Sequence, residues 1–234
     1  MPGTLYLIPT ILGQQNARDV IPAKSIETTK RLRHFIVEEL RTARRYLRQI
    51  DKNFPIDECL FNVLNEHTGY SELEEMLAPL EKGIDAGLMS EAGLPCIADP
   101  GSKIVSLAHK RQYRIATAAG SSSIILALVA SGLNGQNFAF NGYLPVKPAE
   151  LTKKIKEIER KSADGAAQIF METPYRNDKT IEALLETCNA GTNLCIAADI
   201  SLPTESIATK TISEWRKTDI KYNNRLAVFV MQSS

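Results

Sequence analysis

Residues 90–101 read SEAGLPCIADPG and directly follow a strand expected at residues 84–89. This segment is longer than the roughly 2–6 residues that usually connect a strand to the next helix. It contains two glycines, two prolines and two carboxylates, Glu91 and Asp99. That length and composition favour a ligand-binding loop over an irregular surface turn.

Short apolar, β-branched runs alternate with helical patterns on both sides of this loop. We expect strands at residues 5–8, 34–37, 60–64, 84–89 and 114–118. The run Ser71-Glu72-Leu73-Glu74 is typical of a capping box that starts a helix, and Ser102 of the N-cap of another. Strands that alternate with helices at this spacing predict an α/β fold with a mostly parallel five-stranded sheet.

The second half of the chain has a different pattern. An apolar helix is expected at residues 121–133, a charged helix at 153–161, and a turn at Asn141-Gly142. Strands are expected at residues 138–140, 168–171, 194–198, 207–212 and 226–231. The closing strands have little helix between them, which predicts hairpins and a mixed sheet with helices. We therefore expect an N-terminal α/β domain at residues 1–118 and a C-terminal α/β domain at 119–234.

The composition is that of an ordinary globular protein. Of 234 residues, 44% are hydrophobic and 24% charged, which excludes a disordered or fibrous chain. The net charge of +1 argues against a protein that coats nucleic acid, although a local basic patch is compatible with it. No apolar run approaches the ~18 residues of a membrane span. The first residues show no signal-peptide pattern, so we expect no membrane association and a cytoplasmic protein.

Several common chemistries lack their motifs. The four cysteines show no C-x-x-C pair and the three histidines no metal-ligand spacing, so we expect buried reduced thiols and no metal rather than disulfides or zinc. The chain contains no G-x-G-x-x-G after the first strand, no P-loop and no G-x-S-x-G elbow. Loops of small, polar residues instead follow the expected strands, at residues 9–13, 119–123 and 172–176, which indicates a compact ligand bound largely by backbone groups.

Four stretches together resemble the tetrapyrrole methylase superfamily: GTLYLIPT (3–10), SEAGLPCIADPG (90–101), AAGSSSIILALVASGLNGQNFAFNGYLPVK (118–147) and IFMETPYRND (169–178). They are most similar to the branch of ribosomal RNA small-subunit methyltransferases I, which reads SDAGTPxIxDPG and FYESPHR at the matching places. The resemblance implies a two-domain fold with S-adenosylmethionine (SAM) in the cleft between the domains, and a homodimer. It also implies 2′-O-methylation of a ribosomal RNA cytidine and S-adenosylhomocysteine (SAH) as product.

The same resemblance implies which residues bind SAM. They lie in the strand-end loops and on two later strands: Pro9, Thr10, Gly13, Ser90, Glu91, Ala92, Gly93, Leu94, Pro95, Gly120, Ser121, Ser122, Ser123, Met171 and Ala198. The chain departs from the branch at Glu91, which replaces Asp, at residues 11–15, where PTPIGNL is expected from residue 9, and at residues 37–41, where AEDTR is expected. These departures leave two alternatives open: methylation of a tetrapyrrole or other small molecule, and SAM binding without catalysis.

Charged residues after the second expected strand bear on the methyl acceptor. Arg41, Arg44, Arg45 and Arg48 share one helical face, which predicts either a phosphate-binding stripe or a solvated surface. Glu38, Glu39 and Arg41 are the candidate catalytic residues, because transfer to a ribose hydroxyl needs a base or a stabilised alkoxide. The alternative for the two glutamates is an acidic pair that favours a helix N-terminus.

Overall fold

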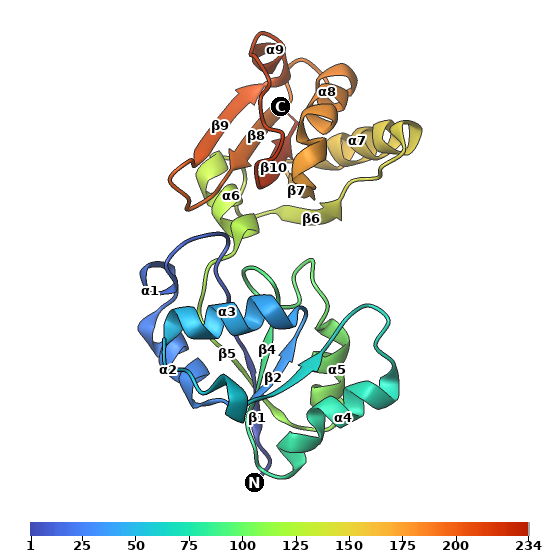
Figure 1. Ribbon diagram of the computed structural model, residues 1–234. Coiled ribbons are helices and arrows are strands. Elements are labelled where there is room, and N and C mark those ends of the chain that lie inside the picture. Colours follow the sequence, from blue (N-terminus) through green and yellow to red (C-terminus); the bar gives the residue numbers. More distant parts are fainter. Residues whose placement is uncertain (234) are drawn as a thin grey trace. The chain divides into compact units, whose positions relative to one another are not determined.

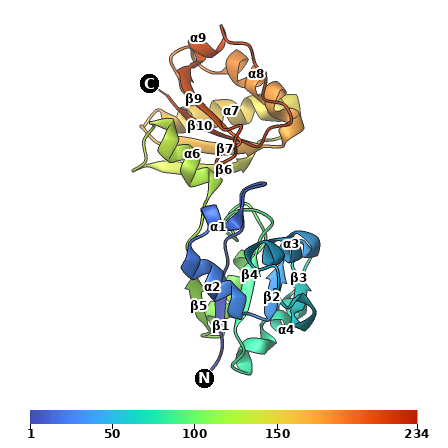
Figure 2. The same ribbon diagram turned by 60° about the vertical axis from the view of Figure 1, so that its left-hand side comes forward.

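The computed structural model describes residues 1–233 and divides into two compact units, Met1–Ser122 and Ser123–Ser234 (Figures 1 and 2). Each unit has its own sheet and hydrophobic core. Within the described part of the chain, no helix has both the length and the apolar character to cross a bilayer.

The N-terminal unit contains a five-stranded sheet in the order β3-β2-β4-β1-β5, and every neighbouring pair is parallel. Its strands are β1 (Thr4–Leu7), β2 (His34–Val37), β3 (Leu60–Val63), β4 (Ala86–Met89) and β5 (Arg114–Thr117). The predicted parallel sheet is therefore confirmed, with strand ends within two residues of those expected.

Helices cover both faces of this sheet, because alternate strand residues point to opposite sides. Phe35 and Val37 pack into the core under the first three helices, whereas Ile36 packs with the other two. The helical segments are α1 (Ala17–Val20), α2 (Ala23–Arg31), α3 (Leu40–Ile50), η1 (Ile56–Glu58), α4 (Tyr70–Glu81) and α5 (Ser102–Lys110). The chain leaves the adjacent strands β1 and β4 toward opposite faces. Such divergence at the carboxyl ends of parallel strands opens a ligand-binding crevice.

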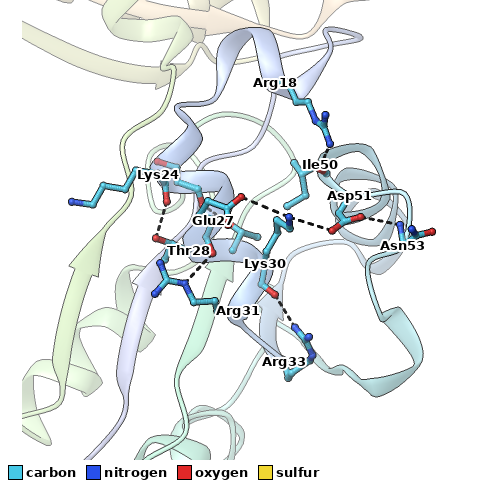
Figure 3. Close-up of polar contacts among 12 residues, drawn as sticks. Arg18, Lys24, Glu27, Thr28, Lys30, Arg31, Arg33, Ile50, Asp51 and Asn53 are labelled. Carbon is cyan, nitrogen blue, oxygen red and sulfur yellow. Dashed lines mark hydrogen bonds and ion pairs between the residues drawn. The ribbon is translucent and has the colours of Figure 1, made fainter.

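Polar contacts hold α1 and α2 against the end of α3 (Figure 3). The Lys30 ammonium lies 3.4 Å from the Asp51 carboxylate, and the Arg18 guanidinium donates to the carbonyl of Ile50 over 3.3 Å. Exposed pairs of this kind add little to stability. These contacts instead fix the position of the C-terminal end of α3, the helix that carries the four arginines of the stripe.

The C-terminal unit has a mixed sheet in the order β6-β7-β10-β8-β9, in which only β6 and β7 are parallel. Its elements are α6 (Ser123–Ser131), β6 (Phe138–Tyr143), α7 (Pro148–Ser162), β7 (Ala167–Glu172), η2 (Pro174–Arg176), α8 (Asn177–Thr187), β8 (Asn193–Ala198), β9 (Ser206–Thr211), α9 (Ile212–Trp215) and β10 (Ala227–Gln232). The mixed sheet is confirmed. The expected hairpin of the two closing strands is wrong, because β9 pairs antiparallel with β8, and β10 inserts between β7 and β8 instead of pairing with β9.

The predicted capping box at residues 71–74 is wrong. Helix α4 begins two residues after Thr68, and the amide of its N-cap, Gly69, donates to the Glu72 carboxylate over 2.7 Å. Ser71 therefore lies inside the helix, and Glu74 pairs with Arg111 instead. A carboxylate does bind the N-cap amide, but it belongs to Glu72, two residues earlier than the sequence pattern predicted.

Two glycines explain the other local differences. Gly101, not Ser102, is the N-cap of α5, with φ +141°, and a Cβ there would lie 2.7 Å from the Cys96 sulfur. Asn141 and Gly142 form no turn between elements but an irregularity inside β6, where the register against β7 shifts. Gly142, with φ +67°, supplies the conformation that such a bulge needs.

Candidate functional site

The loops that follow β1, β4 and β5 meet at the carboxyl edge of the N-terminal sheet. The amide of Thr10 donates to the carbonyl of Gly93 over 2.8 Å. A Cβ on Gly120 would lie 2.1 Å from the Cβ of Pro9, so only glycine allows these two loops to approach so closely. A Cβ on Gly93, whose φ is +74°, would lie 3.2 Å from the Leu12 side chain and 3.5 Å from the carbonyl oxygen of Ser121. The three predicted cofactor loops of this unit therefore form one surface.

The loop at residues 90–101 has an unusual backbone. Cys96 and Ala98 adopt the left-handed region with φ +72° and +66°, in addition to Gly93 and Gly101. Non-glycine residues in this region cost free energy and persist only where the surroundings impose them. Such conformations concentrate at ligand sites, which is in keeping with the binding role predicted for this loop.

A cavity of about 710 Å³ lies beside the meeting loops. It is bounded by the loop after β1, one side of α3 and the start of the loop after β4. The lining residues are Thr10, Ile11, Leu12, Gly13, Gln14, Thr42, Arg45, Tyr46, Arg48, Gln49, Glu91 and Ala92. Four residues predicted to bind cofactor thus share a cavity with two arginines of the predicted stripe.

Gln15 shapes the first loop and was missed by the sequence analysis. Its side-chain oxygen accepts hydrogen bonds from the amides of Leu12 and Gly13 over 3.0 and 3.1 Å. Its carbonyl accepts a bond of 2.7 Å from the side chain of Gln49 on α3. The loop is therefore tied to the helix across the cavity. The available signal was the departure of residues 11–15 from the branch pattern.

The two glutamates that are candidate catalytic bases, Glu38 and Glu39, have different environments. Glu39 caps α3, because its carboxylate accepts from the amides of Arg41 and Thr42 over 2.9 and 2.6 Å, and these bonds lower its pKa. Glu38 is half-buried and accepts from the amide of Glu91 over 3.2 Å. Burial, and then the carboxylates of Asp99 and Glu91, raise the pKa of Glu38 above its usual value despite that bond.

The arginines of the stripe are all exposed, but they do not act alike. Arg45 and Arg48 line the cavity, whereas the Arg44 guanidinium lies over the Phe61 ring, 5.3 Å from its centroid. Arg41 lies next to the carboxylate of the helix cap, Glu39. Only part of the predicted stripe therefore faces the cavity.

The remaining predicted cofactor residues lie in several places. Ser90 and Pro95 are buried, and Leu94, Ser121 and Ser122 partly exposed, all in the meeting loops of the N-terminal unit. Ser123 starts α6, Met171 lies partly exposed on β7, and Ala198 is fully buried in the core of the C-terminal unit. The cofactor roles of all these residues, and of those in the meeting loops, stay predictions.

The stretch at residues 172–176 is built around an internal ion pair. The buried Glu172 carboxylate lies 3.1 Å from the Arg176 guanidinium and accepts a bond of 3.1 Å from the Thr180 hydroxyl. Arg176 also donates to the carbonyl of Pro145 over 3.1 Å. These contacts join two of the motif stretches, which gives Glu172 and Arg176 a structural role.

Residues 1–233 contain no group of three or more His, Cys, Asp or Glu side chains placed to hold a metal ion. Cys188 and Cys195 are buried, and Cys59 and Cys96 partly exposed. Burial is the main cause that raises the pKa of the Cys188 thiol to about 12, so this thiol stays protonated at neutral pH.

Comparisons with known proteins agree with this architecture. Residues 17–215 match the family model described as Tetrapyrrole (Corrin/Porphyrin) Methylases. The chain is 26% identical to ribosomal RNA small subunit methyltransferase I of Pseudomonas aeruginosa, over 91% of this chain and 71% of that protein. It is 29% identical to the protein of the same name from Escherichia coli O157:H7, over 93% and 73%.

Two solved structures share the fold. Uroporphyrin-III-C-methyltransferase from Thermus thermophilus superposes with a TM-score of 0.60 at 15% identity, over 98% of this chain and 94% of that one. The methyltransferase CobJ superposes with a TM-score of 0.64 at 14% identity, over 99% and 95%. The predicted two-domain fold is thus confirmed.

Proposed function

Because the chain belongs to the tetrapyrrole (corrin/porphyrin) methylase family, we propose that it transfers a methyl group from SAM to a ribose hydroxyl of ribosomal RNA. One observation carries this proposal: the meeting loops share a cavity with Arg45 and Arg48. The names of the relatives support a ribosomal RNA acceptor in the small subunit.

The N-terminal loops fit the chemistry of SAM. They present backbone groups and small side chains, and Gly93 and Gly120 stand where larger residues would push the loops apart. The Glu91 carboxylate in the cavity wall suits the ammonium of the methionine part. SAM supplies a methyl group on a sulfonium, which is already a good leaving group. We assign its binding to loops 9–13, 90–95 and 120–123, with Met171 and Ala198 as predicted contributors.

Glu38 is the residue that we assign as the base. Its raised pKa brings the carboxylate nearer to the range in which a base is most effective near neutral pH. The hydrogen bond from the Glu91 amide orients it, and Asp99 and Glu91 increase its affinity for a proton. Glu39 is engaged as a helix cap, so we assign it a structural role and place Arg41 beside it in support.

Salt dependence distinguishes the two candidate acceptors, because the guanidinium groups of the cavity suit the anionic groups of both. The phosphodiester backbone of RNA is attracted to Arg45 and Arg48 at all pH values of interest, because arginine stays protonated. A tetrapyrrole also carries carboxylates, and the family description and the solved structures name such substrates for other members. The two differ in salt dependence, since only a nucleic acid releases a dense counterion atmosphere on binding.

Transfer of labelled methyl from SAM tests the proposal. The acceptors are small ribosomal subunits, free ribosomal RNA and a panel of tetrapyrroles, with SAH titrated by calorimetry in parallel. We expect one SAH site per chain and label in the RNA as 2′-O-methylcytidine. Label in a tetrapyrrole alone would replace the RNA assignment, and SAH binding without transfer to any acceptor would favour a binding protein.

Two further expectations accompany this function. Sedimentation of the purified chain tests the predicted homodimer, for which a single protomer mass would be the contrary result. A ribosomal substrate also implies that the enzyme works in the cytoplasm, which fractionation of cells that express the tagged chain can check.

A further inference from the structure

The hydroxyl of Tyr46 has no hydrogen-bond partner among the described residues. Tyr46 lies on α3 and is only 2% exposed, yet it is among the residues that line the cavity beside the meeting loops. The ring packs in the hydrophobic core under α1 to α3. The polar end of this side chain is thus buried without compensation in the free protein.

An orphaned hydroxyl of this kind is rare and costly. Most buried polar side-chain atoms in folded proteins have a partner, and one without it loses its bonds to water and gains nothing in return. Phenylalanine would fill the same space in the core without that loss. A tyrosine at this position therefore indicates a partner that the free chain lacks.

The neighbours of Tyr46 define the chemistry of that partner. Thr42 and Gln49 lie on the same side of α3, and Arg45 and Arg48 flank Tyr46 at the cavity wall. Gln49 is committed to Gln15, and Arg48 donates to the carbonyl of Lys52 over 2.9 Å. Arg45 forms no ion pair with any residue from 1 to 233. This side of the cavity offers donors and positive charge.

We propose that the Tyr46 hydroxyl, with Arg45 and Arg48, forms a subsite for a phosphodiester oxygen of the RNA acceptor. This inference rests on the proposed function and adds a specificity-determining residue to it. The hydroxyl donates to the oxyanion, while the two guanidinium groups balance its charge. Burial raises the pKa of Tyr46 well above its usual value, so the hydroxyl keeps its proton at neutral pH.

The charges that line the cavity distinguish this subsite from the cofactor. Glu91, on the loop after β4, also lines the cavity, and its carboxylate suits the cationic ammonium of the methionine part. The sulfonium and ammonium of SAM are repelled by two guanidinium groups, whereas a phosphodiester is attracted to them. The methionine carboxylate is the one other oxyanion that could bind the same donors, and the experiment below separates the two sources.

The test compares Tyr46→Phe with wild type and with Tyr113→Phe, which removes an exposed hydroxyl bound to Glu81 on another part of the unit. Three quantities are measured: the midpoint of thermal unfolding, the affinity for SAH in the absence of RNA, and the affinity and methylation kinetics with ribosomal RNA over a range of salt. Phenylalanine keeps the ring, so the core packing is retained.

For Tyr46→Phe we expect an equal or higher unfolding midpoint, SAH affinity within twofold of wild type, and RNA affinity weaker by about tenfold or more, the usual worth of a bond to a charged group. The slope of RNA affinity against salt stays the same, because no charge is removed. Tyr113→Phe leaves RNA and SAH binding unchanged.

Three outcomes would overturn the inference. RNA affinity and kcat/KM equal to wild type would show that the hydroxyl only packs. A matched loss of SAH affinity would assign the donors to the methionine carboxylate. A wild-type chain that binds SAH but no RNA would contradict the proposed function itself. That failure is distinguishable from failure of the subsite, because it is seen in the wild type and not only in the variant.

Discussion

The amide of Thr10 donates a hydrogen bond of 2.8 Å to the carbonyl of Gly93, which joins the loop after β1 to the loop after β4. The Thr10 hydroxyl adds a longer bond of 3.4 Å to the carbonyl of Ser90. The two strands are neighbours in the sheet, but their chains leave toward opposite faces. This backbone bridge therefore holds together a surface that would otherwise separate.

Gly120→Ala should abolish SAH binding. The added Cβ would lie 2.1 Å from the Cβ of Pro9, so the loop after β1 must move away from the loop after β5. The damage comes from the displaced loop rather than from a side chain in the ligand's space, so thermal stability should fall together with SAH affinity.

Gly135→Ala is the matched control, because a Cβ at Gly135 meets nothing within 4 Å and its backbone is not left-handed. Calorimetry with SAH and a thermal melt of both variants check the prediction. Normal SAH affinity in Gly120→Ala would place the cofactor away from these loops.

Glu38→Gln should lower kcat by about 10²–10⁴-fold, the usual contribution of a general base. The pKa of Glu38 is raised in the folded state, so its ionisation opposes folding, and its stability contribution is present at low pH and lost as pH rises through the folded pKa. Removal of the charge should thus leave the free energy of unfolding at pH 7 equal to wild type or higher. The amide oxygen of glutamine can still accept from Glu91.

Glu39→Gln provides the contrast for that variant. It weakens the cap of α3, so stability falls while kcat changes little, provided that assays are run below the unfolding midpoint. The wild-type profile of kcat/KM should rise with pH through a pKa above the usual 4.5 of glutamate. Equal losses of kcat in Glu38→Gln and Glu39→Gln would contradict the assignment of Glu38 as the base and Glu39 as the helix cap.

Arg45→Ala combined with Arg48→Ala should weaken RNA binding and leave SAH affinity intact. Each phosphate contact removed should reduce the slope of log affinity against log salt by about 0.7–0.9. Arg160→Ala, which removes an exposed charge on α7, should leave the slope as it is. Titrations of RNA binding at several salt concentrations decide this, and an unchanged slope in the double variant would favour a small-molecule acceptor.

Arg176→Ala should destabilise the C-terminal unit by about 3–5 kcal/mol, because the Glu172 carboxylate would be left buried and unpaired. Tyr175→Ala, at a neighbouring exposed position, should cost little. Denaturant unfolding of the two variants tests the assignment. A stable Arg176→Ala protein with lost activity would instead make this motif part of the reaction site.

Much of this protein can be predicted from local sequence patterns. The spacing of apolar residues determined the strands. Alternation of strands with helices predicted the parallel sheet of the first half, and closing strands with little helix between them predicted the mixed sheet of the second. The motif stretches determined the family, and the small residues after the strands indicated the binding loops. These features depend on neighbours in the chain, so one sequence is enough to read them.

Packing between distant segments decided the rest. Ser71 has the chemistry of a helix cap, but the preceding turn begins α4 at Tyr70 and leaves Gly69 in that position. The split of the arginines, the cap made by Glu39 and the unpartnered hydroxyl of Tyr46 depend on which side of α3 meets the first loop. Residue types state what a side chain can bind, whereas the fold decides whether a partner lies within reach.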